Sequence, residues 1–290
     1  MMTLIFIHGI AMDPDPAQAG AIEASWRAAL ARRDRDGRID AQPRQLAYYA
    51  DILHKYRPGL TMAHGAAAPE RPPGDEALQA ELLSEIIASI DHGALGLVDI
   101  GLAAPASAAA PRGAERLGPI SDYLPRLPAD LIALIGRFLR QADLYFTNRE
   151  AAAEIDARVL ATLEPALAAG QRPIIIAHSL GSVIACKLLA AMSGRWPADQ
   201  VPQLITMGSP LALAAIRRRL PPPFGRPAIA AEWRNYYATT DFVAGGQGIP
   251  AGGDARIVNH QRRGMPFPYH LPEDYLDNAA LADHLAATLP

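Results

Sequence analysis

The sequence has few features of a disulfide-bonded, membrane-spanning or nucleic-acid-binding protein. Cys186 is the only cysteine among 290 residues, so the chain can form no internal disulfide bond. No apolar stretch approaches the roughly 18 residues that a transmembrane helix needs. The 27 Lys and Arg against 30 Asp and Glu give a formal net charge of −3, which offers no positive surface for nucleic acid or an anionic membrane. We therefore expect a soluble, cytoplasmic protein that binds no nucleic acid.

Motifs for cofactors are also lacking. No G-x-G-x-x-G follows the first apolar run, and the chain has no Walker lysine loop, no H-E-x-x-H and no paired Cys and His spacing for zinc. We therefore expect neither a metal nor an organic cofactor. The stretch "MMTLIFIHGI" has no basic start, and its apolar run is short and includes His8. These features favour a first strand over a signal peptide.

The first 55 residues have the pattern of a strand, a helix and a second strand. "TLIFIHG" is a short apolar run that ends at a glycine, as buried parallel strands do. Residues 17–33 carry Ile22, Trp26 and Leu30 at intervals of four, which predicts an amphipathic helix. "RQLAYYADI" follows as a second predicted strand. This βαβ unit indicates an α/β fold.

Regular patterns resume after residue 128 and alternate in the same way. "ADLIALIGRFLRQADLYF" is apolar nearly all round, and "TNRE" at 147–150 fits a capping box for the helix that follows. Four more predicted strands are "PIIIAH", "QLITMGSPL", "EWRNYYATTD" and "ARIVN". Residues 272–289 are predicted to form the closing helix. The order favours a mostly parallel, doubly wound sheet with helices on both faces.

Residues 56–128 differ in composition from both flanks. Loops rich in Ala, Pro and Gly surround a predicted helix over 75–90, in which Leu78, Leu82, Ile86 and Ile90 share one face. We expect this segment to be an insertion that lies over the sheet like a lid or cap.

The stretch "IIIAHSLGSVIACKLLA" places Ser179 between a strand and a helix. A serine at such a junction, with small residues two before and two after it, is typical of a nucleophile elbow. The usual pattern is G-x-S-x-G; here Ala177 replaces the first glycine, and Gly181 is the second. The alternative interpretation is that Ser179 only caps the helix.

A serine nucleophile needs a base and a carboxylate that orients the base. Asp241 directly follows a predicted strand and is the expected acid, with Asp254 as an alternative in a glycine-rich loop. His270, just before the closing helix, is preferred as the base over His260, at the end of the last strand. The loop before the last helix is the one expected to reach across the sheet edge to Ser179.

The tetrahedral anion formed by attack on a carbonyl needs two N–H donors. We expect them from the backbone of Leu180, at the start of the helix, and of Ile10, in the turn after the first strand. His8 and His178 are interpreted as buried structural histidines. Cys186, seven residues beyond the serine, is interpreted as a core residue rather than a reactive thiol.

With "FIHGI", "AHSLG", Asp241 and "YHLPEDYLDN" in this order, the chain resembles the α/β-hydrolase superfamily, and most of all its lipase and esterase-like branches. The resemblance covers residues 3–55 and 130–289. It implies a single α/β-hydrolase domain over 1–290 with 56–128 as a lid-like insertion, a Ser179–Asp241–His270 triad, and a small-molecule or lipid ester as substrate. The family's two extra antiparallel strands at the start are not expected here.

Other functions stay open at this point. The same residues serve serine peptidases, amidases and thioesterases, and a hydrolase fold can also be a non-catalytic binding protein. Arg217, Arg218 and Arg219 form a consecutive basic run. We weigh two interpretations of it, a clamp for a substrate carboxylate and a solvated helix end, and we favour the second.

Overall fold

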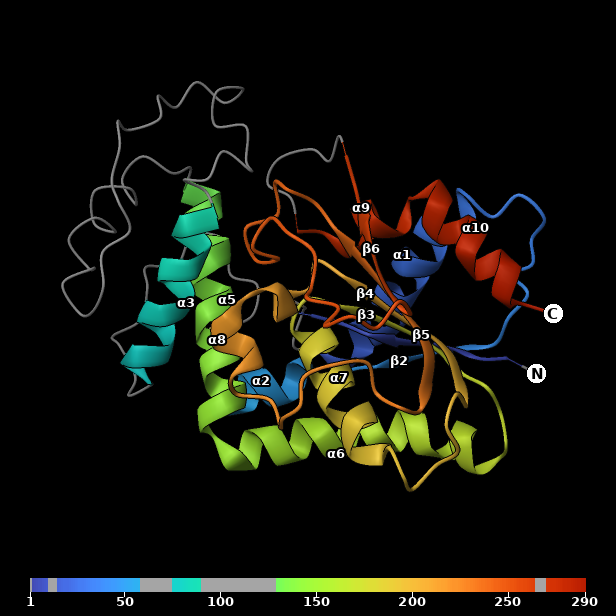
Figure 1. Ribbon diagram of the computed structural model, residues 1–290, viewed down its shortest axis with the longest axis horizontal. Coiled ribbons are helices and arrows are strands. Elements are labelled where there is room, and N and C mark those ends of the chain that lie inside the picture. The colour runs from blue at the N-terminus through green and yellow to red at the C-terminus, as the bar shows by residue number, and fades with distance from the viewer. Residues whose placement is uncertain (1, 10–14, 58–74, 90–128, 264–269) are drawn as a thin grey trace.

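The computed structural model describes residues 2–9, 15–57, 75–89, 129–263 and 270–290 (Figure 1). Within them the chain forms a six-stranded sheet with the order β2-β1-β3-β4-β5-β6, and every neighbouring pair of strands is parallel. The strands are β1 Leu4–Ile7, β2 Arg44–Ala47, β3 Ile174–His178, β4 Val201–Met207, β5 Ala230–Tyr237 and β6 Ile257–Gln261. The prediction of an α/β fold with a parallel sheet is confirmed.

Helices cover both faces of this sheet (Figure 1). Helices α1, α9 and α10 lie on one face, and α6 and α7 lie on the other. The described helices are α1 Ala19–Ala31, α2 Ala50–Tyr56, α3 Glu76–Ser89, α5 Ala129–Thr147, α6 Arg149–Ala168, α7 Leu180–Met192, α8 Ala214–Arg217, α9 Pro272–Leu276 and α10 Ala279–Thr288. The arrangement is a three-layer sandwich of helices, sheet and helices.

Strand β1 is apolar throughout because both of its faces are buried. In β1, Leu4 and Phe6 join the hydrophobic core under α1 and α10, whereas Ile5 and Ile7 join the core on the opposite face. Successive side chains of a strand point to opposite faces, so one continuous apolar run supplies both cores. A parallel sheet of this kind aligns the carboxyl ends of its strands at one edge.

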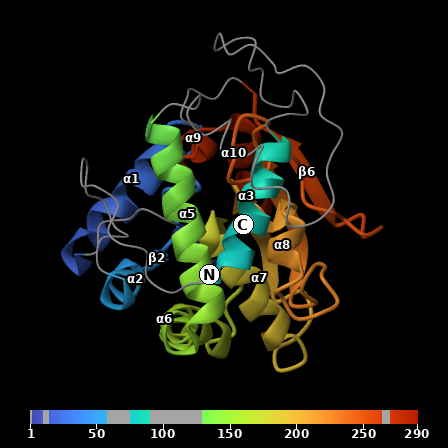
Figure 2. The ribbon, with the colours of Figure 1, turned by 90° about the vertical axis from the view of Figure 1, so that its left-hand side faces the viewer.

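Helices α3, α5 and α8 lie side by side beyond this edge (Figures 1 and 2). Leu78, Leu82 and Ile86 of α3 are fully buried, as the spacing predicts, and Ile90 lies outside the described residues. The helix predicted over 75–90 is therefore confirmed as α3. Most of the segment 56–128, for which a lid-like role is predicted, lies outside the described residues.

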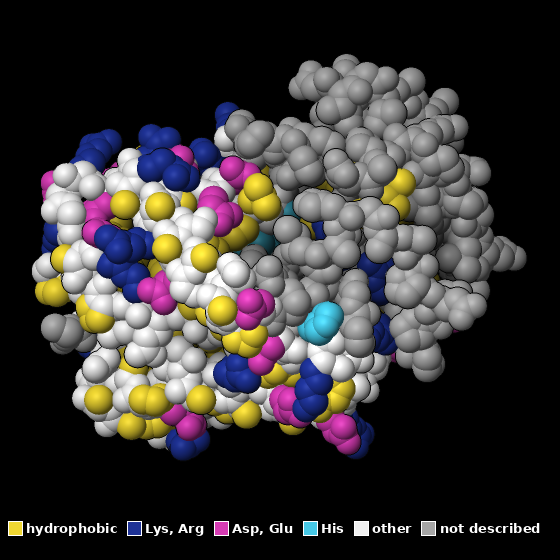
Figure 3. Space-filling view, turned by 180° about the vertical axis from the view of Figure 1, so that it is seen from behind, with side chains coloured by type: hydrophobic (Ala, Val, Ile, Leu, Met, Phe, Trp, Pro, Cys, Tyr) yellow, Lys and Arg dark blue, Asp and Glu magenta, His cyan; other side chains and the backbone are white. Residues whose placement is uncertain are grey.

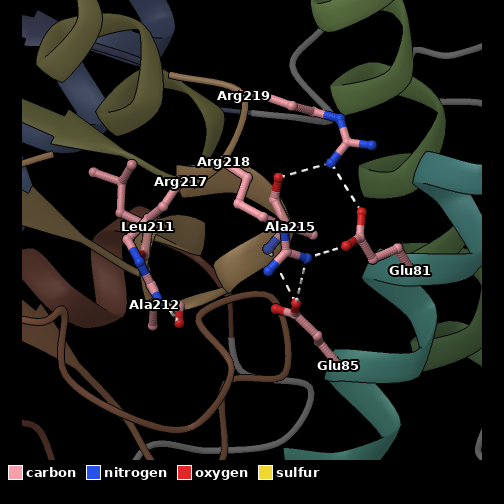
Figure 4. A network of polar contacts seen from close by, with 8 residues as sticks. All are labelled: Glu81, Glu85, Leu211, Ala212, Ala215, Arg217, Arg218 and Arg219. Carbon is pink, nitrogen blue, oxygen red and sulfur yellow. Dashed lines mark hydrogen bonds and ion pairs between the residues drawn. The ribbon is translucent and has the colours of Figure 1, made fainter. Parts of the chain in front are cut away.

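Polar contacts join α3 to α8 (Figure 4). Glu81 accepts hydrogen bonds from Arg218 and, at 3.0 Å, from Arg219. Glu85 accepts the backbone N–H of Ala215 at 3.0 Å, and its carboxylate lies 3.5 Å from Arg218. These contacts fix α3 against the turn that follows β4.

The third arginine of the run binds backbone rather than a carboxylate. Arg217 donates to the carbonyl oxygens of Leu211 and Ala212 at 2.8 and 2.6 Å (Figure 4). The basic run is thus neither simply a solvated helix end nor an open clamp for a substrate. Its guanidinium groups bind other groups of this chain.

Three boundaries differ from the predictions. The strand predicted for "RQLAYYADI" ends at Ala47, because the N–H of Tyr49 bonds to His8 and α2 begins at Ala50. The capping box predicted at 147–150 is wrong, since Asn148 caps α6 by accepting from the N–H of Ala151. The predicted closing helix is two helices, because the backbone at Asp277 and Asn278 is not helical and the Asn278 side chain caps α10.

Charged side chains of both signs are scattered over the face shown in Figure 3, among hydrophobic ones. No single-sign patch stands out among the described residues of that view. Within the described part of the chain, no helix has both the length and the apolar character needed to cross a bilayer.

Candidate active site

Ser179 lies where β3 ends and α7 begins, in a strained backbone conformation. Its φ of 53° and ψ of −129° are unusual for a residue with a side chain. A Cβ on Gly181 would lie 2.2 Å from the carbonyl oxygen of His8, and one on Gly9 would lie 2.4 Å from the Cβ of Ser179. The sharp turn therefore requires glycine at both positions. The Ser179 side chain makes no capping bond to α7, which argues against the interpretation of Ser179 as a helix cap.

The structure brings the three predicted triad residues together. Ser179 Oγ lies 2.7 Å from His270 Nε2, and Asp241 Oδ2 lies 2.9 Å from His270 Nδ1. Because the carboxylate only accepts hydrogen bonds, Nδ1 carries the proton of the neutral ring. Nε2 is then free to accept the hydroxyl proton of Ser179, as a general base must.

The carboxylate of Asp241 is fully buried and receives further hydrogen bonds. Its Oδ1 accepts from the backbone N–H groups of Val243 and Ala244 at 3.0 and 3.1 Å. Its Oδ2 accepts from the hydroxyl of Tyr275 at 2.7 Å. Hydrogen bonds of this kind offset the cost of burying a carboxylate.

Sequence reasoning did not identify Tyr275. Burial and the neighbouring Asp241 raise the pKa of Tyr275 well above its ordinary value, so the phenol stays protonated and donates. Its oxygen also accepts the N–H of Ala238 at 3.2 Å. Tyr275 is five residues from His270 and 34 from Asp241, and no spacing pattern connects it with either.

His8 is buried and hydrogen-bonded to backbone, as predicted. Its Nε2 accepts the N–H of Tyr49 at 2.9 Å, so Nδ1 carries the proton and lies 2.8 Å from the carbonyl oxygen of Gly9. Burial lowers the pKa of His8 to about 4, which keeps the ring neutral near pH 7. The ring thereby joins the end of β1 to the start of α2.

Leu180 is the predicted oxyanion donor that lies within the described residues. Leu180 is the first residue of α7 and directly follows Ser179. Its N–H belongs to the first helical turn, whose N–H groups have no partner within the helix. Ile10 lies outside the described residues.

His178 precedes the serine and is also buried. Its ring lies 4.6 Å from the ring of His270 and 6.3 Å from that of Trp26. Burial, together with the nearby His270 and His8, lowers the pKa of His178 well below its ordinary value. A neutral aromatic ring therefore packs beside the candidate base.

The alternative acid and base have other partners. Asp254 accepts from Arg226 at 2.9 Å and from the N–H of Arg256 at 2.9 Å, as a turn-forming residue does. The His260 ring stacks on Tyr236 with centroids 4.8 Å apart. Burial lowers the pKa of His260 to about 4. Neither side chain is part of the hydrogen-bonded series at Ser179.

Ser182, in the first turn of α7, also contacts the turn at Ser179, which the sequence did not indicate. Ser182 donates its hydroxyl to the carbonyl oxygen of Ser179 at 2.6 Å. Its oxygen also lies 2.6 Å from that of Ser209, in the turn after β4. These buried contacts tie the serine turn to the neighbouring strand end.

The single cysteine of the sequence lies in the hydrophobic core. Cys186 is buried within α7, and burial raises the pKa of its thiol to about 12. Its interpretation as a core residue is confirmed. Among the described residues, no three His, Cys, Asp or Glu side chains group as metal ligands would.

No protein-family model matches the chain, and no curated protein matches it. The all-parallel sheet with helices on both faces is compatible with an α/β-hydrolase-like fold.

Proposed function

We propose that this chain is a serine hydrolase that cleaves carboxylic esters through an acyl-enzyme on Ser179. The observation that carries the proposal is the continuous series of hydrogen bonds from Ser179 through His270 to Asp241. It begins on a strained serine turn at the carboxyl edge of a parallel sheet. We also propose that the fold is that of an α/β-hydrolase with residues 56–128 as its insertion.

The reaction follows from this arrangement. His270 Nε2 takes the hydroxyl proton as Ser179 Oγ attacks the ester carbonyl carbon, and Asp241 stabilises the resulting imidazolium. The N–H groups of Leu180 and Ile10 are the proposed donors to the tetrahedral anion. When the intermediate collapses, the C–O bond to the alcohol breaks and the alcohol takes the proton from His270. Water, deprotonated by the same ring, then releases the acid and restores Ser179.

An active-site-directed probe tests the proposal. We expect a fluorophosphonate to form a covalent adduct on Ser179, located by peptide mass spectrometry, and we expect none with Ser179→Ala. Turnover of p-nitrophenyl esters of increasing chain length, measured beside a thioester and a peptide amide, identifies the preferred bond. Absence of the adduct in folded protein would refute the enzyme proposal and favour the binding-protein alternative. Preference for the amide or thioester would replace the ester assignment.

The identity of the base has a matched control in this chain. His270→Ala is expected to lower kcat by about 10³-fold or more, because the serine loses its proton acceptor. His260→Ala removes a histidine at the end of β6 that does not bond to Ser179, and it is expected to keep kcat within about threefold. The reverse result, with loss of turnover in His260→Ala alone, would contradict the proposed triad.

A further inference from the structure

Two donors share one oxygen of the Asp241 carboxylate. Oδ2 accepts from His270 Nδ1 at 2.9 Å and from the Tyr275 hydroxyl at 2.7 Å, whereas Oδ1 lies 3.1 Å from the same nitrogen and accepts from two backbone N–H groups. We propose that Tyr275 is a positioning residue of the active site, which fixes the carboxylate against His270 and weakens its attraction for the imidazole proton. The proposal rests on the proposed function, because it assigns a role in setting the catalytic base.

Tyr275 is itself rigidly held. Its oxygen accepts from the N–H of Ala238 at 3.2 Å, so the hydroxyl proton is directed to Asp241. A Cβ built on Gly208 would lie 2.9 Å from Asp241 Oδ2, 3.1 Å from the Tyr275 ring and 3.2 Å from His270 Cε1. The carboxylate, the phenol and the imidazole therefore pack so closely around Gly208 that a side chain at this position would not fit.

The hydrogen bond has a predictable effect on the base. A phenol that donates to a carboxylate stabilises its negative charge and draws electron density from the bonded oxygen, here Oδ2, which is the one nearer to His270 Nδ1. The carboxylate then stabilises the imidazolium less strongly. The Tyr275 hydroxyl therefore limits how strongly Asp241 attracts the proton on His270 Nδ1.

Tyr275→Phe tests this role, because it removes the hydroxyl and keeps the ring. We expect the midpoint of protonation of the His270 ring to rise by about 0.5–1 pH unit, measured from its imidazole NMR signals. The acid limb of kcat/KM for a p-nitrophenyl ester is expected to shift in the same direction. A midpoint unchanged within 0.2 pH unit would overturn the proposal.

Tyr236→Phe is the matched control. Tyr236 belongs to the same hydrophobic core as Tyr275, and its hydroxyl also bonds to an acid–base side chain, His284 Nδ1, at 2.6 Å. Its loss is expected to leave the His270 midpoint unchanged. An equal shift in both variants would mean that the effect comes from general loosening of the core, and it would refute the specific role of Tyr275.

A second substitution covers the case in which Tyr275→Phe does not fold. A fluorinated tyrosine incorporated at residue 275 keeps the hydroxyl and is a stronger donor, so the His270 midpoint is expected to fall. A rise or no change would contradict the proposal. The NMR titration needs no substrate, so it is independent of the enzyme assignment. If the midpoint shifts but the protein forms no fluorophosphonate adduct, the proposed role of Tyr275 stands and the proposed hydrolase function is refuted.

Discussion

At the residue scale, the missing side chain of Gly181 allows the start of α7 to approach the end of β1. The space that a Cβ would need is occupied by the backbone oxygens of His8 and Ile7. Backbone atoms cannot move away from an added methyl group as the end of a flexible side chain can. The strained turn of Ser179 is therefore held by contact with an adjacent strand as well as by its own hydrogen bonds.

Gly181→Ala is expected to destabilise the protein by about 1–3 kcal/mol, because β1 and α7 must separate. Gly20→Ala, on α1, is the control, since no atom lies within 4 Å of the added methyl group. Alanine there is expected to stabilise by up to about 1 kcal/mol through helix propensity. Urea unfolding of the two variants measures the difference, and equal stabilities would disprove the close contact at Gly181.

Some site residues could be predicted from the sequence and others could not. Ser179 directly follows β3 and Asp241 lies four residues beyond the end of β5, and positions that follow strands meet at the carboxyl edge of a parallel sheet. The position of His270 before the last helices favours it over His260 as the base, and its ring does contact both partners. Tyr275 lies inside α9 and Ser182 inside α7. The sequence does not show whether a buried tyrosine or serine on a helix contacts the active site or only packs in the core.

At the element scale, α3 is attached to the turn after β4 by charges as well as by its apolar face. Glu81 lies between Arg218 and Arg219, and its side chain is about one-third exposed. Each such pair contributes little alone, because water and salt screen it. Two arginines on one carboxylate form a small network, which holds its geometry better than a single pair does.

Glu81→Gln is expected to lower the free energy of unfolding by about 0.5–1 kcal/mol at low salt. The loss should shrink in 1 M NaCl, where the screening length falls to about 3 Å. Glu164→Gln, which breaks a single surface pair with Arg195, is the control and should cost less. Thermal unfolding at both salt concentrations measures this, and a salt-independent loss for Glu81→Gln would contradict an electrostatic attachment.

Element type was predictable, and element ends were less so. The spacing of apolar residues located α1, α3 and the strands, because burial of one or both faces of an element makes apolar residues recur at regular intervals. The ends depend on individual polar contacts. Tyr49 ends β2 by bonding to His8, and Asn148 takes the capping position that Thr147 was predicted to have. Such contacts join partners far apart in the chain or compete with equally suitable neighbours.

At the scale of the whole molecule, buried neutral histidines couple stability to pH. His8 has a pKa of about 4 in the folded protein, because burial disfavours its charged form, against about 6.5 for an exposed histidine. Between these pH values the unfolded chain binds a proton that the folded chain does not. Stability therefore falls as the pH drops from about 6.5 to 4, and this contribution levels off below that range.

His8→Gln is expected to be less stable than wild type at pH 7, yet to lose about 2 kcal/mol less between pH 7 and pH 5. Wild type unfolded in parallel under the same conditions is the reference. Urea unfolding at several pH values gives both quantities. A pH dependence of His8→Gln as steep as that of wild type would contradict a neutral, buried His8.

The layered architecture was predictable because strands buried on both faces read as unbroken apolar runs, such as Ile174–Ile176. The position of α3 beside α5 and α8 was not, because nothing in its own spacing names its partners. Its apolar face must pack against another element, but the spacing does not say which one. Glu81 and Glu85 on its other side bind arginines that are more than 130 residues away in the sequence.

The burial of Cys186 has a practical consequence for experiments on this protein. The sequence contains no other thiol, and this one is enclosed and protonated at working pH. A cysteine engineered at any exposed position would therefore react alone with a maleimide. Fluorophores or spin labels could be attached in pairs or singly to follow distances in the folded molecule, with the native residue left in place.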